Sequence, residues 1–160
     1  MEPVQVRNNI TRLLDQRKIE YTAHEFPPEK LSAEEVAGLL KVPPGRVFKT
    51  IVVTRVERGK PILAIVPGPR EVDLKAVART VGEKKVQLPT QREAERLTGL
   101  QAGGISPLAL LNKGFQVLLD SSAREYETIY ISGGQRGLNV QLPVEDLMRL
   151  TNAQLAPIST

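Results

Sequence analysis

The 160-residue chain has no cysteine and only one histidine, His24. Without cysteine, the sequence can hold no disulfide, no thiolate metal site and no cysteine nucleophile. A serine–histidine–acid triad would have to use His24, whose polar neighbours in a short predicted strand favour a solvent-facing position over a catalytic one. The chemistry of any enzyme built on this chain therefore has to come from other side chains, from the backbone or from the substrate.

Aromatic residues and long apolar runs are also scarce. Aromatics make up 4% of the chain and tryptophan is absent, which argues against the base-stacking platforms of single-strand binders. No stretch approaches the ~20 apolar residues of a membrane span, and the N-terminus lacks the apolar run of a signal peptide. The acids Asp120, Glu125 and Glu127 have no metal-ligand spacing. We therefore expect a cytoplasmic protein with no membrane partner, no metal and no cofactor.

The overall composition is that of an ordinary globular domain. Hydrophobic residues make up 41% of the chain and charged residues 25%, and no repeat or composition shift divides it, so we predict a single domain over residues 1–160. The net charge of +4 suits an anionic partner without requiring one.

Hydrophobic periodicity and capping residues predict about five helices and seven strands, irregularly interleaved. Helices are expected over residues 4–18, after the capping residues Ser32, Asp73 and Thr90, and from Pro143 onward. Strands are expected at 19–26, 46–56, 61–66, 84–88, 115–120, 128–132 and 138–142. This order is typical of a mixed α+β domain and not of a doubly wound sheet.

Lys49 breaks the pattern of its strand. Alternation places it on the same face as Val47, Ile51 and Val53, where an ammonium is costly to desolvate unless an anion meets it. It is either a cleft lysine that holds a phosphate or carboxylate or polarises a carbonyl, or a lysine at a strand end or sheet edge whose amine reaches water. The pattern alone favours the second interpretation.

Two glycine-rich segments, residues 103–107 and 132–137, connect predicted elements. Adjacent glycines let backbone groups approach a ligand and form anion-binding nests. Neither segment matches a nucleotide-binding fingerprint, and the second has the form of a tight hairpin turn. Together with Lys49 they suggest a shared pocket, and phosphate binding through Gly133 and Gly134 stays open as an alternative.

Three segments in this order resemble the YbaK/prolyl-tRNA synthetase-associated editing domain family. They are the Phe48-Lys49-Thr50 strand, residues 103–108 and residues 128–138, and the similarity extends over nearly the whole chain. The resemblance implies a mixed, strongly curved, barrel-like sheet of about seven strands surrounded by helices. It implies an aminoacyl-tRNA deacylase of translation fidelity, most similar to the free-standing YbaK type that acts on Cys-tRNA(Pro).

The resemblance also implies roles for individual residues. Lys49 matches the hallmark functional lysine and is expected to be catalytic. The implied substrate-binding residues are Phe26, Thr50, Gly103, Gly104, Ile105, Ser106, Pro107, Ser132, Gly133, Gly134 and Asn139. Phe26 and Asn139 stand where the most similar relatives commonly carry tyrosine and aspartate, which bears on the amino acid removed.

In the cysteine-specific members of that family, the thiol of the substrate attacks its own ester, so the protein supplies no nucleophile. Two alternatives stay open: an editor of another amino acid, alanine or a non-protein one, and an inactive module that binds tRNA or a synthetase. The expected partners are the acceptor end of an aminoacylated tRNA and prolyl-tRNA synthetase, which would supply tRNA identity.

Overall fold

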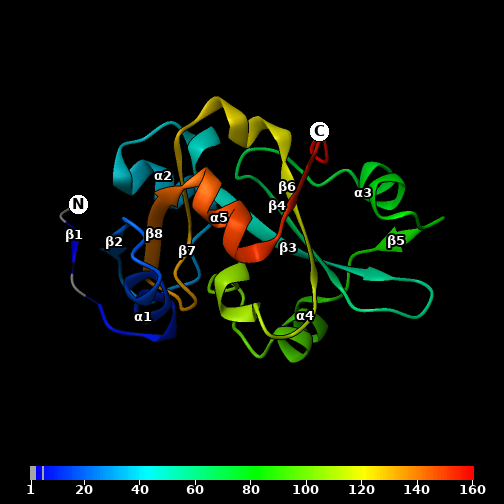
Figure 1. Cartoon of the computed structure of the whole chain (residues 1–160), viewed down its shortest axis with the longest axis horizontal. Coiled ribbons are helices and arrows are strands. Elements are labelled where there is room, and N and C mark those ends of the chain that lie inside the picture. The colour runs from blue at the N-terminus through cyan, green and yellow to red at the C-terminus, as the bar shows by residue number, and fades with distance from the viewer. Residues whose placement is uncertain (1–2, 5) are drawn as a thin grey trace.

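The computed structural model describes residues 3–4 and 6–160 (Figure 1). Over these residues the chain forms an α+β structure with two sheets and five α-helices, which confirms the predicted class. In chain order the elements are β1 (Pro3–Val4), α1 (Asn9–Gln16), β2 (Thr22–Glu25), α2 (Ala33–Leu40), β3 (Phe48–Arg55), β4 (Ile62–Pro67), α3 (Leu74–Val81), β5 (Val86–Gln87), α4 (Gln91–Thr98), β6 (Gln116–Asp120), β7 (Thr128–Ser132), β8 (Leu138–Pro143), α5 (Val144–Thr151) and β9 (Gln154–Ala156). Short 3-10 turns precede β3, β6 and β7.

The first sheet is antiparallel and has the strand order β1-β2-β8-β7. The two-residue strand β1 lies at one of its edges. One of its faces is apolar and packs into the main core against α1 and α5, through residues that include Ala23, Ile129, Ile131, Val140 and Leu142. The residues between them carry polar side chains on the opposite face, namely Thr22, His24, Ser132, Asn139 and Gln141. This period-two division makes one face of the sheet available for a polar site.

The second sheet is mixed, in the order β5-β3-β4-β6-β9. β3 and β4 form the antiparallel hairpin that the sequence predicts, and β6 and β9 are added in parallel. Every residue of β4 is buried because the main core covers one face of the sheet and α3 the other. On β3, Phe48 and Val52 face the main core, while Ile51 and Val53 face α3.

The prediction of one strongly curved, barrel-like sheet is wrong, because the strands divide into two sheets. At this boundary Val47, the residue before β3, forms an isolated bridge with Tyr130 of β7, and no ladder joins the two sheets among the described residues. Alternation in a sequence tells which residues of a strand face the core, but it does not tell which strands share hydrogen bonds. The division was therefore invisible in the pattern.

The predicted helix caps are confirmed. Ser32 and Glu35 form the reciprocal capping box of α2, and the side chains of Asp73 and Thr90 cap α3 and α4. The first helix is shorter than predicted: α1 begins after its cap Asn8, within the predicted segment 4–18, of which Gln5 lies outside the described residues. The short strands β1 and β9 were not predicted. Within residues 3–4 and 6–160, no helix has the length and apolarity that a membrane crossing requires.

Candidate active-site cleft

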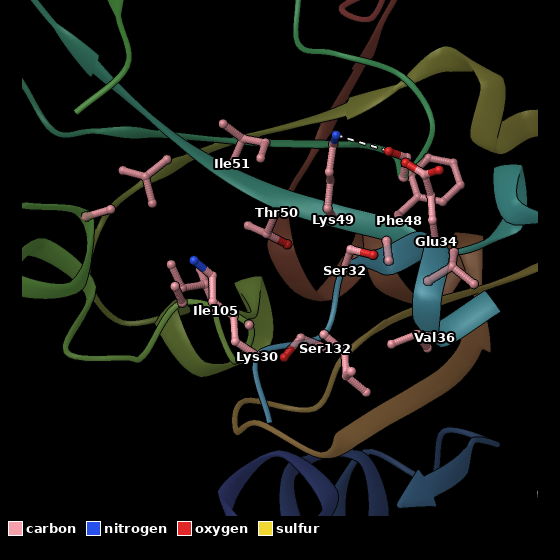
Figure 2. Close-up of a pocket in the computed structure, with 18 of the residues that line it drawn as sticks. Lys30, Ser32, Glu34, Val36, Phe48, Lys49, Thr50, Ile51, Ile105 and Ser132 are labelled. Atoms are coloured by element: carbon pink, nitrogen blue, oxygen red, sulfur yellow. Dashed lines mark hydrogen bonds between the residues drawn. The ribbon is translucent and has the colours of Figure 1, made fainter. Parts of the chain in front are cut away.

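A cleft of about 450 Å³ opens where the two sheets meet, beside the first half of β3. Its walls come from β3, the start of α2, the start of α4, the loop after Gly103 and the ends of β7 and β8. Figure 2 shows Lys49, Thr50 and Ile51 along β3, with Ile105 and Ser132 across the opening. A volume of this size is in the range of ~300–1,000 Å³ that small-molecule sites usually have.

Lys49 lies in the wall of this cleft with its side chain 26% exposed. Its Nζ donates a hydrogen bond to the carbonyl oxygen of Gly68 at 3.1 Å (dashed line in Figure 2) and lies 3.7 Å from Oε1 of Glu71. Glu71 is 84% exposed, so this ion pair is weak and easily exchanged for another anion. Lys49 is thus a cleft lysine, the interpretation that the pattern alone did not favour, and it is held by one carbonyl and one replaceable partner.

The two glycine-rich loops pack directly against each other. A Cβ atom on Gly104 would lie 2.9 Å from Cα of Gln135 and 3.0 Å from the backbone nitrogen of Arg136. Arg136 in turn donates from Nε to the carbonyl oxygen of Ala102 at 2.7 Å. The absence of a side chain at Gly104 therefore lets the β7–β8 connection close onto the loop that carries Gly103 and Ile105, both of which line the cleft.

Ser132 and Asn139 are cross-strand partners on β7 and β8 and line the deep side of the cleft. The hydroxyl oxygen of Ser132 accepts a hydrogen bond from the backbone N–H of Gly134 at 3.2 Å, which shapes the start of the hairpin loop. Asn139 is only 6% exposed, and its Oδ1 is buried without a hydrogen-bond partner. A buried acceptor without a partner is costly, so this oxygen marks a polar group that the free protein leaves unsatisfied.

His24 is not solvent-facing, and that expectation is wrong. It is 8% exposed, pairs with Asn139 across β2 and β8, and lies 6.0 Å from the ring of Tyr130 between centroids. Desolvation lowers the pKa of His24 below its ordinary value of 6.5, so the ring is neutral near pH 7. β2 is an inner strand between β1 and β8, and the Tyr130 ring lies on the same face of the sheet as His24, so the side chain is enclosed there.

The structure brings part of the predicted substrate-binding set together at the cleft: Thr50, Gly103, Ile105, Ser132 and Asn139 all line it, with Lys49. Phe26 instead lies in a neighbouring apolar cluster with Val36, Val47 and Tyr130. Ser106 is fully buried and caps the 3-10 turn that follows it by accepting from the N–H of Leu108. Gly104, Pro107, Gly133 and Gly134 are not among the residues that line it. Pro107 is buried at the start of the 3-10 turn, and a Cβ on each of the three glycines would lie within 3 Å of another residue.

Sequence reasoning missed several cleft residues. Lys30 Nζ donates to Oε1 of Gln91 at 2.6 Å, which ties the loop before α2 to the start of α4. Glu34 contributes a carboxylate from the first turn of α2, and the half-exposed Leu88 an apolar edge. The capping box at Ser32 placed Glu34 at a helix start, but only the tertiary fold brings that turn to β3.

The described part of the chain contains no group of three or more histidine, cysteine, aspartate or glutamate side chains that could hold a metal ion. What the cleft does offer is two ammonium groups, a carboxylate, glycine-loop backbone and several uncharged polar side chains. This arrangement is suited to binding a polar ligand and stabilising charge on it. It includes no side chain that is evidently activated as a nucleophile.

Comparison with known proteins gives a family model and relatives that match this chain over nearly all or part of their own length. The model of the aminoacyl-tRNA editing domain matches residues 27–150. A protein of Enterococcus faecalis named "Putative Cys-tRNA(Pro)/Cys-tRNA(Cys) deacylase EbsC" is 39% identical over 158 residues, covering 98% of this chain and 95% of the relative. The proline–tRNA ligase of Thermodesulfovibrio yellowstonii is 29% identical over 111 residues, which are 69% of this chain and 18% of the ligase.

The fold is also that of a solved structure. The crystal structure of a hypothetical protein superposes with a TM-score of 0.86 at 22% sequence identity and covers 96% of this chain and 100% of that one. At this level of identity the likeness concerns the fold. The cleft described above lies within the part of the chain that the family model matches.

Proposed function

Since this chain belongs to the aminoacyl-tRNA editing domain family, of the YbaK type, and is an aminoacyl-tRNA deacylase, we propose that its substrate is Cys-tRNA(Pro) and that it acts in trans on the acceptor end. The observation that carries the proposal is the meeting of Lys49, the Gly103 loop and the Ser132–Asn139 pair around one cleft. Cysteine and proline are close in size, and such differences are worth only about 1–3 kcal/mol at one binding site. A separate editing site therefore adds selectivity that a single binding site cannot provide.

The cleft divides the work between binding and charge stabilisation. Lys49 holds its ammonium beside an exposed carboxylate that an incoming phosphate or oxyanion can replace. In the partly desolvated cleft, such an ammonium stabilises the negative charge that develops on the carbonyl oxygen during ester cleavage. The glycine loops bring backbone groups close to the ligand, and Ser132 and Asn139 offer hydrogen bonds on the deep side.

The nucleophile in this proposal belongs to the substrate. The thiol sulfur of the cysteinyl group forms a bond to its own ester carbonyl carbon, and the bond from that carbon to the ribose oxygen breaks. The thiol proton goes to solvent, and the ribose oxygen leaves as a hydroxyl, so the products are free tRNA and a cysteine thiolactone that water then opens. A nucleophile already held within reach gains a large effective concentration, so the protein needs only to orient it.

The partners follow from this substrate. Prolyl-tRNA synthetase would supply tRNA identity, because the cleft has room for an aminoacylated terminus and not for a tRNA body. A second candidate substrate is Ala-tRNA(Pro) or a non-protein aminoacyl ester, favoured by Asn139 and Phe26 where relatives commonly carry aspartate and tyrosine. Alanine has no thiol, so that activity would require an activated water.

The test is deacylation of Cys-tRNA(Pro), Ala-tRNA(Pro) and Pro-tRNA(Pro) by the wild type, Lys49→Ala and the control Lys113→Ala, which removes an exposed lysine outside the cleft. We expect selective loss of the cysteinyl ester, a loss of about 10²-fold in kcat for Lys49→Ala, and no change for Lys113→Ala. Lys49→Ala should fold normally because the partner Glu71 is exposed and the ion pair that is lost is therefore weak. Preferential loss of the alanyl ester would transfer the proposal to the second candidate, and equal slow decay of all three esters would refute both.

A further inference from the structure

A chain of hydrogen bonds crosses the polar face of the first sheet and ends at His24. Arg46 donates to the side chain of Thr128, and Gln141 donates from Nε2 to the same hydroxyl oxygen at 2.9 Å. The other end of the Gln141 amide, Oε1, accepts from the hydroxyl of Thr22 at 3.0 Å. Thr22 has thereby used its single proton, so its oxygen is left as an acceptor.

This polarity determines the tautomer of His24. Its Nε2 lies 3.4 Å from the hydroxyl oxygen of Thr22, and because that oxygen can only accept, Nε2 carries the proton. A neutral imidazole has one proton, so Nδ1 is a lone-pair acceptor. Nδ1 is buried and has no partner in the described structure.

The residue opposite His24 has the matching defect. Asn139 is its cross-strand partner, so their Cβ atoms lie about 4.5–5.5 Å apart on the same face. The buried atom of Asn139 that lacks a partner is Oδ1, also an acceptor. Two acceptors cannot satisfy each other, and each orphaned group is costly.

A half-turn of the Asn139 amide about its Cβ–Cγ bond removes both defects. The turn exchanges oxygen and nitrogen, which are nearly equal in size, and puts the donor Nδ2 at the buried position of Oδ1, on the face that Asn139 shares with its cross-strand partner His24. Among the hydrogen bonds of the described residues none involves the Asn139 side chain, so the turn breaks none. A half-turn of Gln141 would keep its contacts with Thr22 and Thr128 but reverse both hydrogen bonds, which would place the imidazole proton on Nδ1. The tautomer of His24 therefore distinguishes the two networks.

We propose that His24 is a positioning residue that, by accepting from Asn139 Nδ2 through its Nδ1, turns Asn139 Oδ1 into the cleft as the acceptor for the amino group of the substrate. The identity of the donor rests on the proposed function, since an aminoacyl ester carries a free amino group. Ser132, Asn139 and His24 follow one another across the sheet from the cleft inward, so Asn139 is the member that can touch both the ligand and His24. The amide oxygen of Asn139 can thus accept a hydrogen bond from the substrate amino group although Asn139 has no carboxylate.

Burial keeps His24 in the form that this role requires. The ring lies against Tyr130, whose other neighbour is the Arg46 guanidinium at 5.4 Å from the ring centroid. A positive charge on His24 would therefore face an arginine across one ring, in addition to being desolvated. Both effects favour the neutral imidazole and hence the lone pair on Nδ1.

The first test is the ¹⁵N spectrum of the imidazole in the wild type. His24 is the sole histidine, so its signals need no assignment by mutation. We expect a protonated Nε2 and an unprotonated, hydrogen-bonded Nδ1 at pH 7. A proton on Nδ1 would overturn the proposal, because His24 would then donate to Asn139 Oδ1 and leave the amide nitrogen facing the cleft.

The second test measures the affinity of two ligands by calorimetry: 3′-deoxy-3′-(L-cysteinylamino)adenosine and its 3-mercaptopropionyl counterpart, which lacks only the amino group. We expect the wild type to prefer the first ligand about tenfold, as one hydrogen bond to a charged donor is worth ~1.5 kcal/mol. His24→Phe should reduce this ratio toward one with the affinity for the second ligand unchanged. His24→Asn, whose amide oxygen can occupy the position of Nδ1, should retain it.

A purely structural role for His24 would weaken both ligands equally in His24→Phe, leaving the ratio unchanged and overturning the proposal. Equal binding of both ligands by the wild type would also overturn it, while deacylation of Cys-tRNA(Pro) would continue to support the proposed function. If the wild type bound neither ligand, the inference would fail, while deacylation of Cys-tRNA(Pro) would decide separately whether the proposed function stands.

Discussion

Replacement of Gly104 by alanine tests the contact between the two glycine loops that builds the cleft. The new Cβ would lie 2.9 Å from Cα of Gln135 and 3.0 Å from both its carbonyl carbon and the nitrogen of Arg136. These are backbone atoms, which cannot rotate away, so one loop has to move by several tenths of an ångström. Overpacking of this kind costs about 1–3 kcal/mol.

Part of this cost is offset because alanine restricts the unfolded chain, by about 0.4–1 kcal/mol. The expected net loss is about 0.5–2 kcal/mol in the free energy of unfolding, with a fall in Tm of roughly 2–4 °C per kcal/mol for a domain of this size. Because the moved loop carries Gly103 and Ile105, kcat/KM for deacylation should fall about tenfold or more.

The assay is urea unfolding together with deacylation of Cys-tRNA(Pro), and the matched control is Gly38→Ala. Gly38 lies within α2, and nothing lies within 4 Å of its added Cβ. The control should gain about 0.5–1 kcal/mol because alanine is the better helix former, with activity unchanged. If Gly104→Ala were as stable and as active as the wild type, the two loops would not be in the contact described here.

Three further predictions use other parts of the molecule. Glu71→Gln removes the exposed carboxylate that lies 3.7 Å from Lys49 Nζ and competes with the substrate for this ammonium. In steady-state kinetics KM should therefore fall up to about fivefold with kcat unchanged, and a higher KM would contradict this. The buried carboxylate of Asp120 accepts from Ile158 N–H with one oxygen and from Ser122 with the other, whereas an amide can accept with only one. Asp120→Asn should therefore lower the free energy of unfolding in urea by about 1–3 kcal/mol, and a loss under about 0.5 kcal/mol would contradict this. Because the pKa of His24 is lowered in the folded state, the unfolded state binds the proton first as the pH falls. The contribution to stability is therefore full above about pH 6.5 and declines as the pH falls toward the folded-state pKa. Unfolding curves between pH 7.5 and 5 should show a weaker decline in His24→Phe than in the wild type, and identical pH dependence in both proteins would contradict this.

Local signals in the sequence predicted the elements well. Ser32, Asp73 and Thr90 cap helices where their side-chain chemistry requires, and Gly82 and Gly99 end helices in the left-handed conformation. These features depend on interactions within a few residues, which a sequence displays directly. The strand β7 begins and ends at the predicted residues for the same reason.

Long-range features could not be predicted in this way. The division into two sheets depends on which strand edges meet, and β4 pairs with β6 over a separation of about fifty residues. The burial of His24 depends on its position opposite Asn139, more than one hundred residues away in the chain. The polar residues beside His24 in the sequence indicated exposure to solvent instead. The side chains of a strand alternate between two faces, and the sequence of that strand does not show which other elements cover each face.

The candidate site was predicted in part. Alternation singled out Lys49, and the glycine loops suggested a pocket, but neither signal indicated that Gly104 and Gln135 touch. Lys30, Glu34 and Leu88 carry no local signal of function and become cleft residues only through the fold.

The central claim is that this chain cleaves a cysteinyl ester without supplying a nucleophile of its own, in a sequence that contains no cysteine. The most direct measurement is the single-turnover rate of deacylation of Cys-tRNA(Pro) against Ser-tRNA(Pro), which differ by one sulfur-for-oxygen exchange, with Lys49→Ala as the reference. We predict that the cysteinyl ester is lost at least 10²-fold faster and that Lys49→Ala removes most of this rate. Loss of the seryl ester as fast as the cysteinyl ester would contradict the claim.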